Sequence, residues 1–160
     1  GGGKLITNYY NLSNFDPISD AKEMSKLLNA CGRLGFPSLG ISSLMGDKKA
    51  LSEAIDKNKI FKREISAAIR LAEANIRNYD NINTFYHSEI NEKIVGTICS
   101  ILVHSKEYLK SKPLLAFADS DNHFLKVSAR ADRELVKNGL NLGKILREVC
   151  QEMERITENA

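Results

Sequence analysis

The chain has 160 residues, the usual size of one domain with room for a second small lobe. Hydrophobic residues make up 42% and charged residues 27%, with 10 glycines and 3 prolines, which argues against disordered, collagen-like and membrane-embedded chains. Basic residues number 23 and acidic residues 20, and the net charge of +3 is too small to make the whole surface a nucleic-acid binder. Any basic site must therefore be local.

The cysteines and the apolar runs indicate a cellular compartment. Cys31, Cys99 and Cys150 are far apart and odd in number, so we expect buried thiols in a reducing environment, with no structural zinc. The longest apolar run covers residues 114–118, which is too short to span a bilayer, and the N-terminus lacks a basic-then-apolar signal pattern. We therefore expect a cytoplasmic protein without a membrane partner.

The first part of the chain reads as helical. Asp16 followed by Pro17 predicts a helix that begins there, with aspartate as N-cap and proline at the first position. Gly32 and Gly35 are expected to end this helix, because glycine tolerates left-handed backbone angles. The helix would bury one apolar stripe, formed by Met24, Leu27, Leu28 and Cys31.

A short helix and a long helix follow. Ser38 is expected to cap the short helix, over residues 39–45. Asp47 then caps the longest periodic stretch, which extends to about Arg77 and slips in phase near residues 57–59. A helix of that length exceeds what one compact lobe needs, so we interpret it as a connector between two lobes, with a boundary near residue 80.

Beyond the boundary, short strands alternate with helices. Strands are predicted over residues 84–87, 114–118 and 124–130, and helices over 94–103 and 142–156. The fold class is therefore α/β: an N-terminal helical segment and a long connector helix, then a small α/β domain with a mixed sheet flanked by helices.

The strand over residues 124–130 carries the first candidate site. Its period of two puts Lys126, Ser128 and Arg130 on one face, opposite an expected buried face of Leu125, Val127 and Ala129. Two cations and a hydroxyl suit a phosphodiester, because arginine offers a planar fork of donors and lysine a point charge. The alternative is a solvated outer face, as antiparallel sheets commonly have.

A second candidate lies on the first helix. Asn29 and Arg33 are four residues apart in its last turn, and Gly32 leaves room beside them for a ligand. The alternative is a structural arginine that interacts favourably with the helix dipole. His87, His104 and His123 lie in different elements and show no metal-ligand spacing, so neither a metal site nor a catalytic centre is expected in this chain.

The quoted segments carry a family resemblance. Residues 20–40, with Asn29-Ala30-Cys31-Gly32-Arg33, resemble the segment that closes the catalytic domain of archaeal RecJ-type nucleases in the DHH phosphoesterase superfamily. Residues 95–100 and 126–132 are similar to the DHH-associated domain, whose Ser-x-Arg strand faces the nucleic acid or nucleotide phosphate. The resemblance implies that residues 1–46 end the catalytic domain, 47–80 form the connector and 81–160 the substrate-binding domain.

The same resemblance implies a function. The chain would hold single-stranded DNA or RNA for a manganese- or magnesium-dependent exonuclease of replication or repair. Lys126, Ser128, Arg130, Asn29 and Arg33 would be its phosphate contacts. The family's metal motifs would precede residue 1, and its Gly-Gly-Gly-His turn would follow Ala160, so this chain alone is expected to be inactive.

Two alternatives remain. The superfamily includes relatives joined to replicative helicase factors, so the long helix could dock replication proteins through Phe61 or Ile65. Related domains also serve enzymes that act on dinucleotides or other small phosphoesters.

Overall fold

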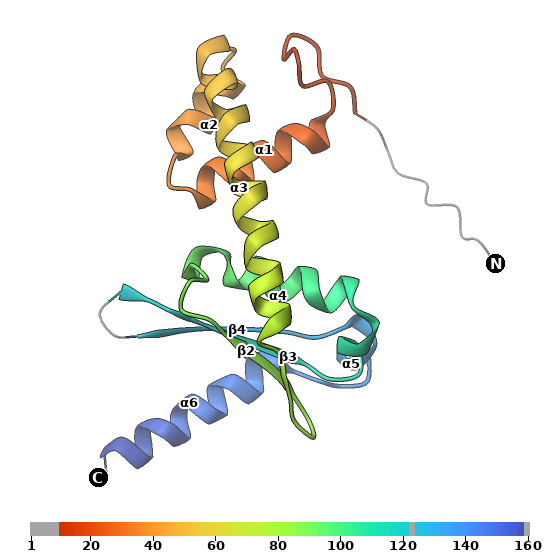
Figure 1. Ribbon diagram of the computed structural model, residues 1–160, viewed down its shortest axis with the longest axis vertical. Helices are drawn as coiled ribbons and strands as arrows, with labels where there is room; N and C mark the ends of the chain where they lie inside the picture. Colours follow the sequence, from red (N-terminus) through yellow and green to blue (C-terminus); the bar gives the residue numbers. More distant parts are fainter. Residues whose placement is uncertain (1–9, 122–123, 159–160) are drawn as a thin grey trace, which may run out of the picture. The chain divides into compact units, whose positions relative to one another are not determined.

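A computed structural model describes residues 10–121 and 124–158. The chain divides into two compact units, one ending at Ser66 and the other starting at Ala67. The division falls inside the long helix α3 (Lys48–Ala74), drawn in yellow to yellow-green in Figure 1.

The first helix of unit 1 begins later than predicted. Helix α1 covers Ala21–Arg33, and its N-cap is Asp20, whose carboxylate accepts a hydrogen bond from the backbone N–H of Lys22 at 3.0 Å. The prediction of a start at Asp16 is wrong because the chain before α1 turns back on itself. The backbone N–H of Leu12 donates to the carbonyl of Ser19 at 2.7 Å, which holds the intervening residues outside the helix.

Helix α2 covers Pro37–Leu44, and its N-cap also differs from the prediction. Phe36 occupies the N-cap position without a side-chain hydrogen bond, and Ser38 lies inside the helix, so Ser38 is not the cap. Proline fits the first helical position because its missing N–H would have no partner there. Gly35 and Gly46, which flank α2, have φ values of +84° and +91°, the left-handed conformation that favours glycine.

Unit 1 has a small core of its own. The apolar stripe predicted for the first helix is confirmed, with Leu28 at its half-buried margin. The buried members of this core come from α1, from the first turns of α3 and from Ile18: Ile18, Met24, Leu27, Cys31, Leu51 and Ala54.

Helix α3 begins as predicted. The carboxylate of Asp47 accepts hydrogen bonds from the backbone N–H groups of Lys49 at 2.9 Å and Ala50 at 3.1 Å. The helix continues without a break through residues 57–59, where the apolar stripe slips. Its 27 residues correspond to about 40 Å.

Unit 2 is built on a mixed four-stranded sheet in the order β1-β2-β3-β4. The strands are β1 (Arg77–Asn78), β2 (Asn83–Tyr86), β3 (Leu114–Asp119) and β4 (Leu125–Arg130). Strands β2 and β3 are parallel, and the other two pairings are antiparallel. The predicted α/β class with a mixed sheet and flanking helices is confirmed.

Helix α4 (Glu92–Ser105) connects the parallel strands and covers one face of the sheet, which we call the front face (Figure 1). Its N-cap is Asn91, whose side-chain oxygen accepts from the N–H of Lys93 at 2.8 Å. Every second residue of β3 is buried on this face, and small side chains at two of the three positions let the helix approach closely: Leu114, Ala116 and Ala118.

The opposite face of the sheet, the back face, is open. The strand register places Tyr86, Phe117, Leu125 and Val127 on it. Leu125 is 58% exposed and Val127 41% exposed, so the predicted burial of these two side chains is wrong. The alternation of β4 is as predicted, but the helix covers the polar side of the strand rather than its apolar side.

The chain ends in two further helices. A 3-10 turn (Glu107–Leu109) lies between α4 and β3. Helices α5 (Arg133–Lys137) and α6 (Leu142–Glu158) follow β4. Helix α6 is on the side of the sheet away from α4 and runs outward from it (Figure 1). Among the helices of the described ranges, none has the length and apolar character needed to cross a membrane.

Asn83 at the start of β2 generates a stability prediction. It is fully buried on the front face, and neither polar atom of its side-chain amide has a hydrogen-bond partner among the described residues. Such a group costs about 1–3 kcal/mol, so Asn83→Leu is expected to leave the free energy of unfolding unchanged or raise it by about 1 kcal/mol. Urea titration measures this, with Phe85→Ala as the control that loses about 3–5 kcal/mol. A loss above 1 kcal/mol for Asn83→Leu would show that the amide has a partner.

Candidate functional site

The polar residues of β4 lie on the helix-covered front face. Lys126, Ser128 and Arg130 pair with Ala118, Ala116 and Leu114 of β3, whose side chains are buried beneath α4. Strand β4 is at the edge of the sheet, where the long side chains of Lys126 and Arg130 reach solvent while Ser128 is half-buried. The alternative of a plain solvated face does not describe this arrangement, because α4 packs against the same side.

Arg130 is held in place by α4 and by its own strand. Its Nε donates a hydrogen bond to the Ser100 hydroxyl at 2.9 Å, and its Nη1 donates to the carbonyl of Ala129 at 2.7 Å. Within the described residues, Nη2 donates to no protein acceptor. A guanidinium oriented through two of its nitrogens presents the third to a ligand with little rotamer entropy left to lose.

Gly96 lets Ser128 and Arg130 of β4 pack closely against α4. A Cβ atom at position 96 would lie 2.8 Å from the Ser128 hydroxyl and 3.5 Å from Nη2 of Arg130. The first distance is too short for a carbon atom, so a side chain here would displace Ser128. We call Gly96, Ser100, Lys126, Ser128 and Arg130 the α4–β4 site.

Cys99 links α4 to the two strands beneath the α4–β4 site. Its Sγ lies 3.3 Å from the carbonyl of Leu114 and 3.7 Å from that of Ser128, so the thiol bridges α4 to both β3 and β4. Burial raises the pKa of this thiol to about 12, and the positive charge of Arg130 offsets only part of that rise. Cys99 is therefore a neutral hydrogen-bond donor at physiological pH rather than a nucleophile.

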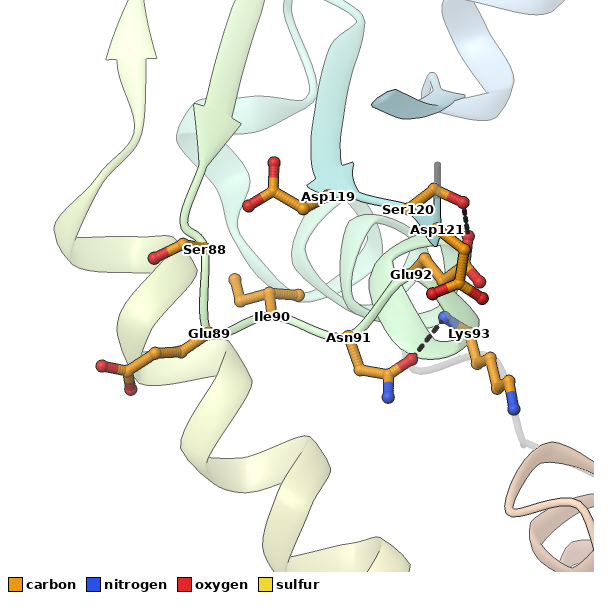
Figure 2. A pocket seen from close by; sticks show the side chains of 9 residues that line it. All are labelled: Ser88, Glu89, Ile90, Asn91, Glu92, Lys93, Asp119, Ser120 and Asp121. Atoms are coloured by element: carbon orange, nitrogen blue, oxygen red, sulfur yellow. Dashed lines mark hydrogen bonds between the residues drawn. The ribbon is translucent and has the colours of Figure 1, made fainter. Parts of the chain in front are cut away.

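An acidic pocket of about 380 Å³ opens at the N-terminal end of α4. Figure 2 shows the carboxylates of Glu89, Glu92, Asp119 and Asp121 around it, with Lys93 as the cation of the lining. The Ser120 hydroxyl donates to Glu92, and the Tyr86 hydroxyl donates to Asp119 at 2.9 Å. Four carboxylates repel a polyanion, so phosphate binding is disfavoured at this pocket.

The pocket also affects the nearby end of β4. Lys126 pairs with Ala118, next to Asp119, whereas Arg130 pairs with Leu114 at the far end of the strand. The acidic residues lower the positive potential near Lys126, and Arg130 is about 13 Å away along the strand. We therefore expect Arg130 to contribute more to anion binding than Lys126.

The other predicted contacts lie elsewhere in the chain. Asn29 and Arg33 are exposed on α1, in unit 1, whereas the α4–β4 site is in unit 2. The structure brings Lys126, Ser128 and Arg130 together on one strand face.

The docking surface suggested for α3 is not formed by the residues that the sequence indicated. Phe61 is only 8% exposed and Ile65 is half-buried, so neither side chain is an open apolar surface.

In the described part of the chain, no group of three or more histidine, cysteine, aspartate or glutamate side chains has an arrangement that could hold a metal ion. Nδ1 of His87 accepts from the backbone N–H of Glu89 at 3.2 Å, and Nδ1 of His104 lies 2.7 Å from the carbonyl of Ser100. His123 lies outside the described residues.

Two site residues, Gly96 and Ser100, were not singled out from the sequence as contacts. Both lie within the segment that carries the family resemblance, and a glycine at the centre of an apolar helix is itself a signal of close packing. Which strand approaches that glycine depends on the tertiary fold, which helical periodicity does not specify.

The chain has a distant similarity to a known protein. No protein-family model matches the chain. An uncharacterized protein of Methanocaldococcus jannaschii is 30% identical to it over 125 residues, covering 78% of this chain and 26% of that protein. The chain thus spans about a quarter of the length of this curated relative.

The three thiols are expected to react differently. Cys31 and Cys99 are fully buried, and burial raises the pKa of both, whereas Cys150 is exposed on α6, contrary to the expectation that it is part of the core. At pH 8, Ellman's reagent should therefore label Cys150 rapidly and the other two only after unfolding. Cys150→Ser should remove the rapid phase, and rapid labelling that persists would mean that a buried thiol is accessible.

The raised pKa of Cys99 also predicts a pH dependence of stability. Between pH 9 and pH 12 the unfolded chain releases a proton that the folded protein retains, so the stabilisation present below pH 9 is lost as pH rises toward 12. The difference in unfolding free energy between the parent protein and Cys99→Ala should shrink by about 1 kcal/mol from pH 9 to pH 10. Urea titrations at both pH values measure it, and a constant difference would contradict the raised pKa.

Proposed function

We propose that unit 2 binds the phosphates of single-stranded DNA or RNA at the α4–β4 site. The observation that carries this proposal is the arginine held by Ser100 and by the Ala129 carbonyl, with Nη2 near Gly96 and Ser128. A planar, oriented guanidinium suits a phosphate oxygen better than a mobile point charge does. Ser128 adds a short hydroxyl donor on the same face.

The spacing of the two cations indicates a chain-like ligand. Lys126 and Arg130 are four residues apart on one strand, about 13 Å, so they can neutralise different phosphates of the same strand. Each phosphate contact on a single strand contributes about −0.7 to the slope of log affinity against log salt. Two contacts give a slope of about −1.4, which means weak and salt-sensitive binding.

The wider role follows from the family resemblance. We propose that the chain is the substrate-holding part of a RecJ-like phosphodiesterase in the cytoplasm, with Asn29 and Arg33 as further phosphate contacts in the whole protein. Manganese or magnesium bound by the rest of that protein would polarise the phosphodiester and activate water. The residues of this chain would bind and orient the strand.

Fluorescence anisotropy of a labelled single-stranded oligonucleotide tests the binding. Arg130→Ala should weaken binding about tenfold at low salt and reduce the salt slope by about 0.7, because one oriented phosphate contact is lost. Lys126→Ala should have the same direction and a smaller effect. Arg133→Ala and Lys137→Ala, equal charge changes on α5 outside the site, are the matched controls. Equal losses of affinity in the control and site variants would mean that the oligonucleotide binds by nonspecific charge attraction.

Gly96→Ala tests the geometry of the site without changing its charge. The added methyl group displaces the Ser128 hydroxyl beside Arg130, so affinity for the oligonucleotide should fall although net charge is unchanged. Circular dichroism melting identifies a variant that has merely unfolded. Unchanged affinity in a folded Gly96→Ala protein would mean that phosphates do not enter beside Gly96.

The length of the ligand distinguishes an oligonucleotide from a small phosphoester. A dinucleotide presents too few phosphates for both Lys126 and Arg130 at about 13 Å separation, so a longer strand should bind more tightly. Competition of the labelled oligonucleotide with unlabelled dinucleotide measures this. Equal affinity for both ligands would favour the enzyme class that acts on small phosphoesters.

A further inference from the structure

The back face of the sheet carries a patch of apolar side chains that the described residues leave partly exposed, beside Asp119, which pairs with Leu125. Tyr86, Leu125 and Val127 are 47%, 58% and 41% exposed on it, and Phe117 is half-buried between them. The three strands that contribute these residues are neighbours in the sheet. A sheet face of this composition is normally covered by another element of the structure.

Helix α6 presents a matching apolar stripe. Leu142 and Leu146 in its first turns are half-buried, whereas the stripe is increasingly exposed toward the end of the helix. The exposed fractions rise in chain order: Ile145 43%, Val149 48%, Met153 62% and Ile156 63%. A 17-residue helix derives most of its stability from packing an apolar face, so the exposed side chains of Ile145, Val149 and Ile156 favour a packing surface for this helix.

We infer that these two surfaces cover each other: α6 docks on the back face of the sheet of its own chain. Helix α6 begins on that side of the sheet, opposite α4 (Figure 1). Residues 138–141 connect it to α5, and Gly139 there has a φ of +99°, a turn conformation that glycine adopts readily. A four-residue connection gives the helix a far higher effective concentration at this face than a separate molecule has.

The dimensions of the two surfaces also agree. The stripe from Ile145 to Ile156 is about 17 Å long, and the six residues of β4 extend about 20 Å. Between the root of α6 and α5 lies a pocket of about 430 Å³, lined by Val136, Gly139, Leu140, Asn141 and Leu142. The turn before α6 therefore has open space beside it, which would allow α6 to move toward the sheet.

Docking of α6 would act on the strand that carries the α4–β4 site. Val127 lies between Lys126 and Ser128 in sequence, and its side chain points to the back face. Covering Val127 would stabilise β4 from the side opposite α4. The inference goes beyond nucleic-acid binding and does not depend on it, because both surfaces are defined without a ligand.

Cross-linking tests the docking directly. Cys150 is an exposed native thiol on α6, and Val127→Cys adds a thiol on the back face. A short bismaleimide should join positions 127 and 150 within one chain, independently of protein concentration, and peptide mass spectrometry identifies the link. Lys126→Cys, next along the strand but on the front face, is the matched control and should not link to Cys150.

Other cross-linking results would overturn the inference. Dimers whose yield rises with protein concentration would mean that a second copy of the chain covers the back face. Absence of a 127–150 link, while both thiols react with a monofunctional maleimide, would mean that α6 stays away from the sheet.

Hydrogen exchange provides a second readout in the full chain. Val149→Asp places a charge in the apolar stripe, so amide exchange in β4 should become about fivefold faster or more. Gln151→Asp, on the polar side of the same helix, should leave exchange unchanged. Equal exchange in the parent protein and Val149→Asp would contradict docking even if the cross-link forms.

Discussion

The close approach of α4 to the edge strand β4 is the constraint on which the candidate site depends. It requires Gly96, because a Cβ there would lie 2.8 Å from the Ser128 hydroxyl. It also brings Ser100 within hydrogen-bond distance of Arg130 and lets the Cys99 thiol donate to strand carbonyls. One backbone contact thus fixes an arginine, a hydroxyl and a neutral thiol in a single arrangement.

Local charge decides where a polyanion can bind to this nearly neutral chain. The net charge of +3 gives little long-range attraction, so the proposed binding of a polyanion would depend on a few oriented donors. The same unit contains an acidic pocket at one end of α4, and that pocket repels phosphates. Positive and negative surfaces along one helix would therefore orient a bound strand as well as attract it.

Much of the fold could be predicted from periodicity, but the covered face of β4 could not. The sequence identifies α4, β3 and β4 because their apolar residues recur at helical or strand intervals. The alternation of β4 separates Lys126 and Arg130 from Val127, yet it does not specify which side a helix covers. The start of α1 differs from the prediction for a similar reason, because Asp16 has the local pattern of an N-cap, but the hydrogen bond from Leu12 to Ser19 holds the residues around Asp16 outside the helix.

Strand β4 carries polar side chains on one face and apolar side chains on the other, and each face depends on a different packing partner. The front face carries polar residues that a helix holds in place, and the back face carries apolar residues that are exposed. A strand at the edge of a sheet has neighbours on one side only, so its position depends on what packs above and below it. Val127 and Arg130 lie three residues apart on opposite faces of this strand, so a cover over Val127 would stabilise the strand that carries the guanidinium.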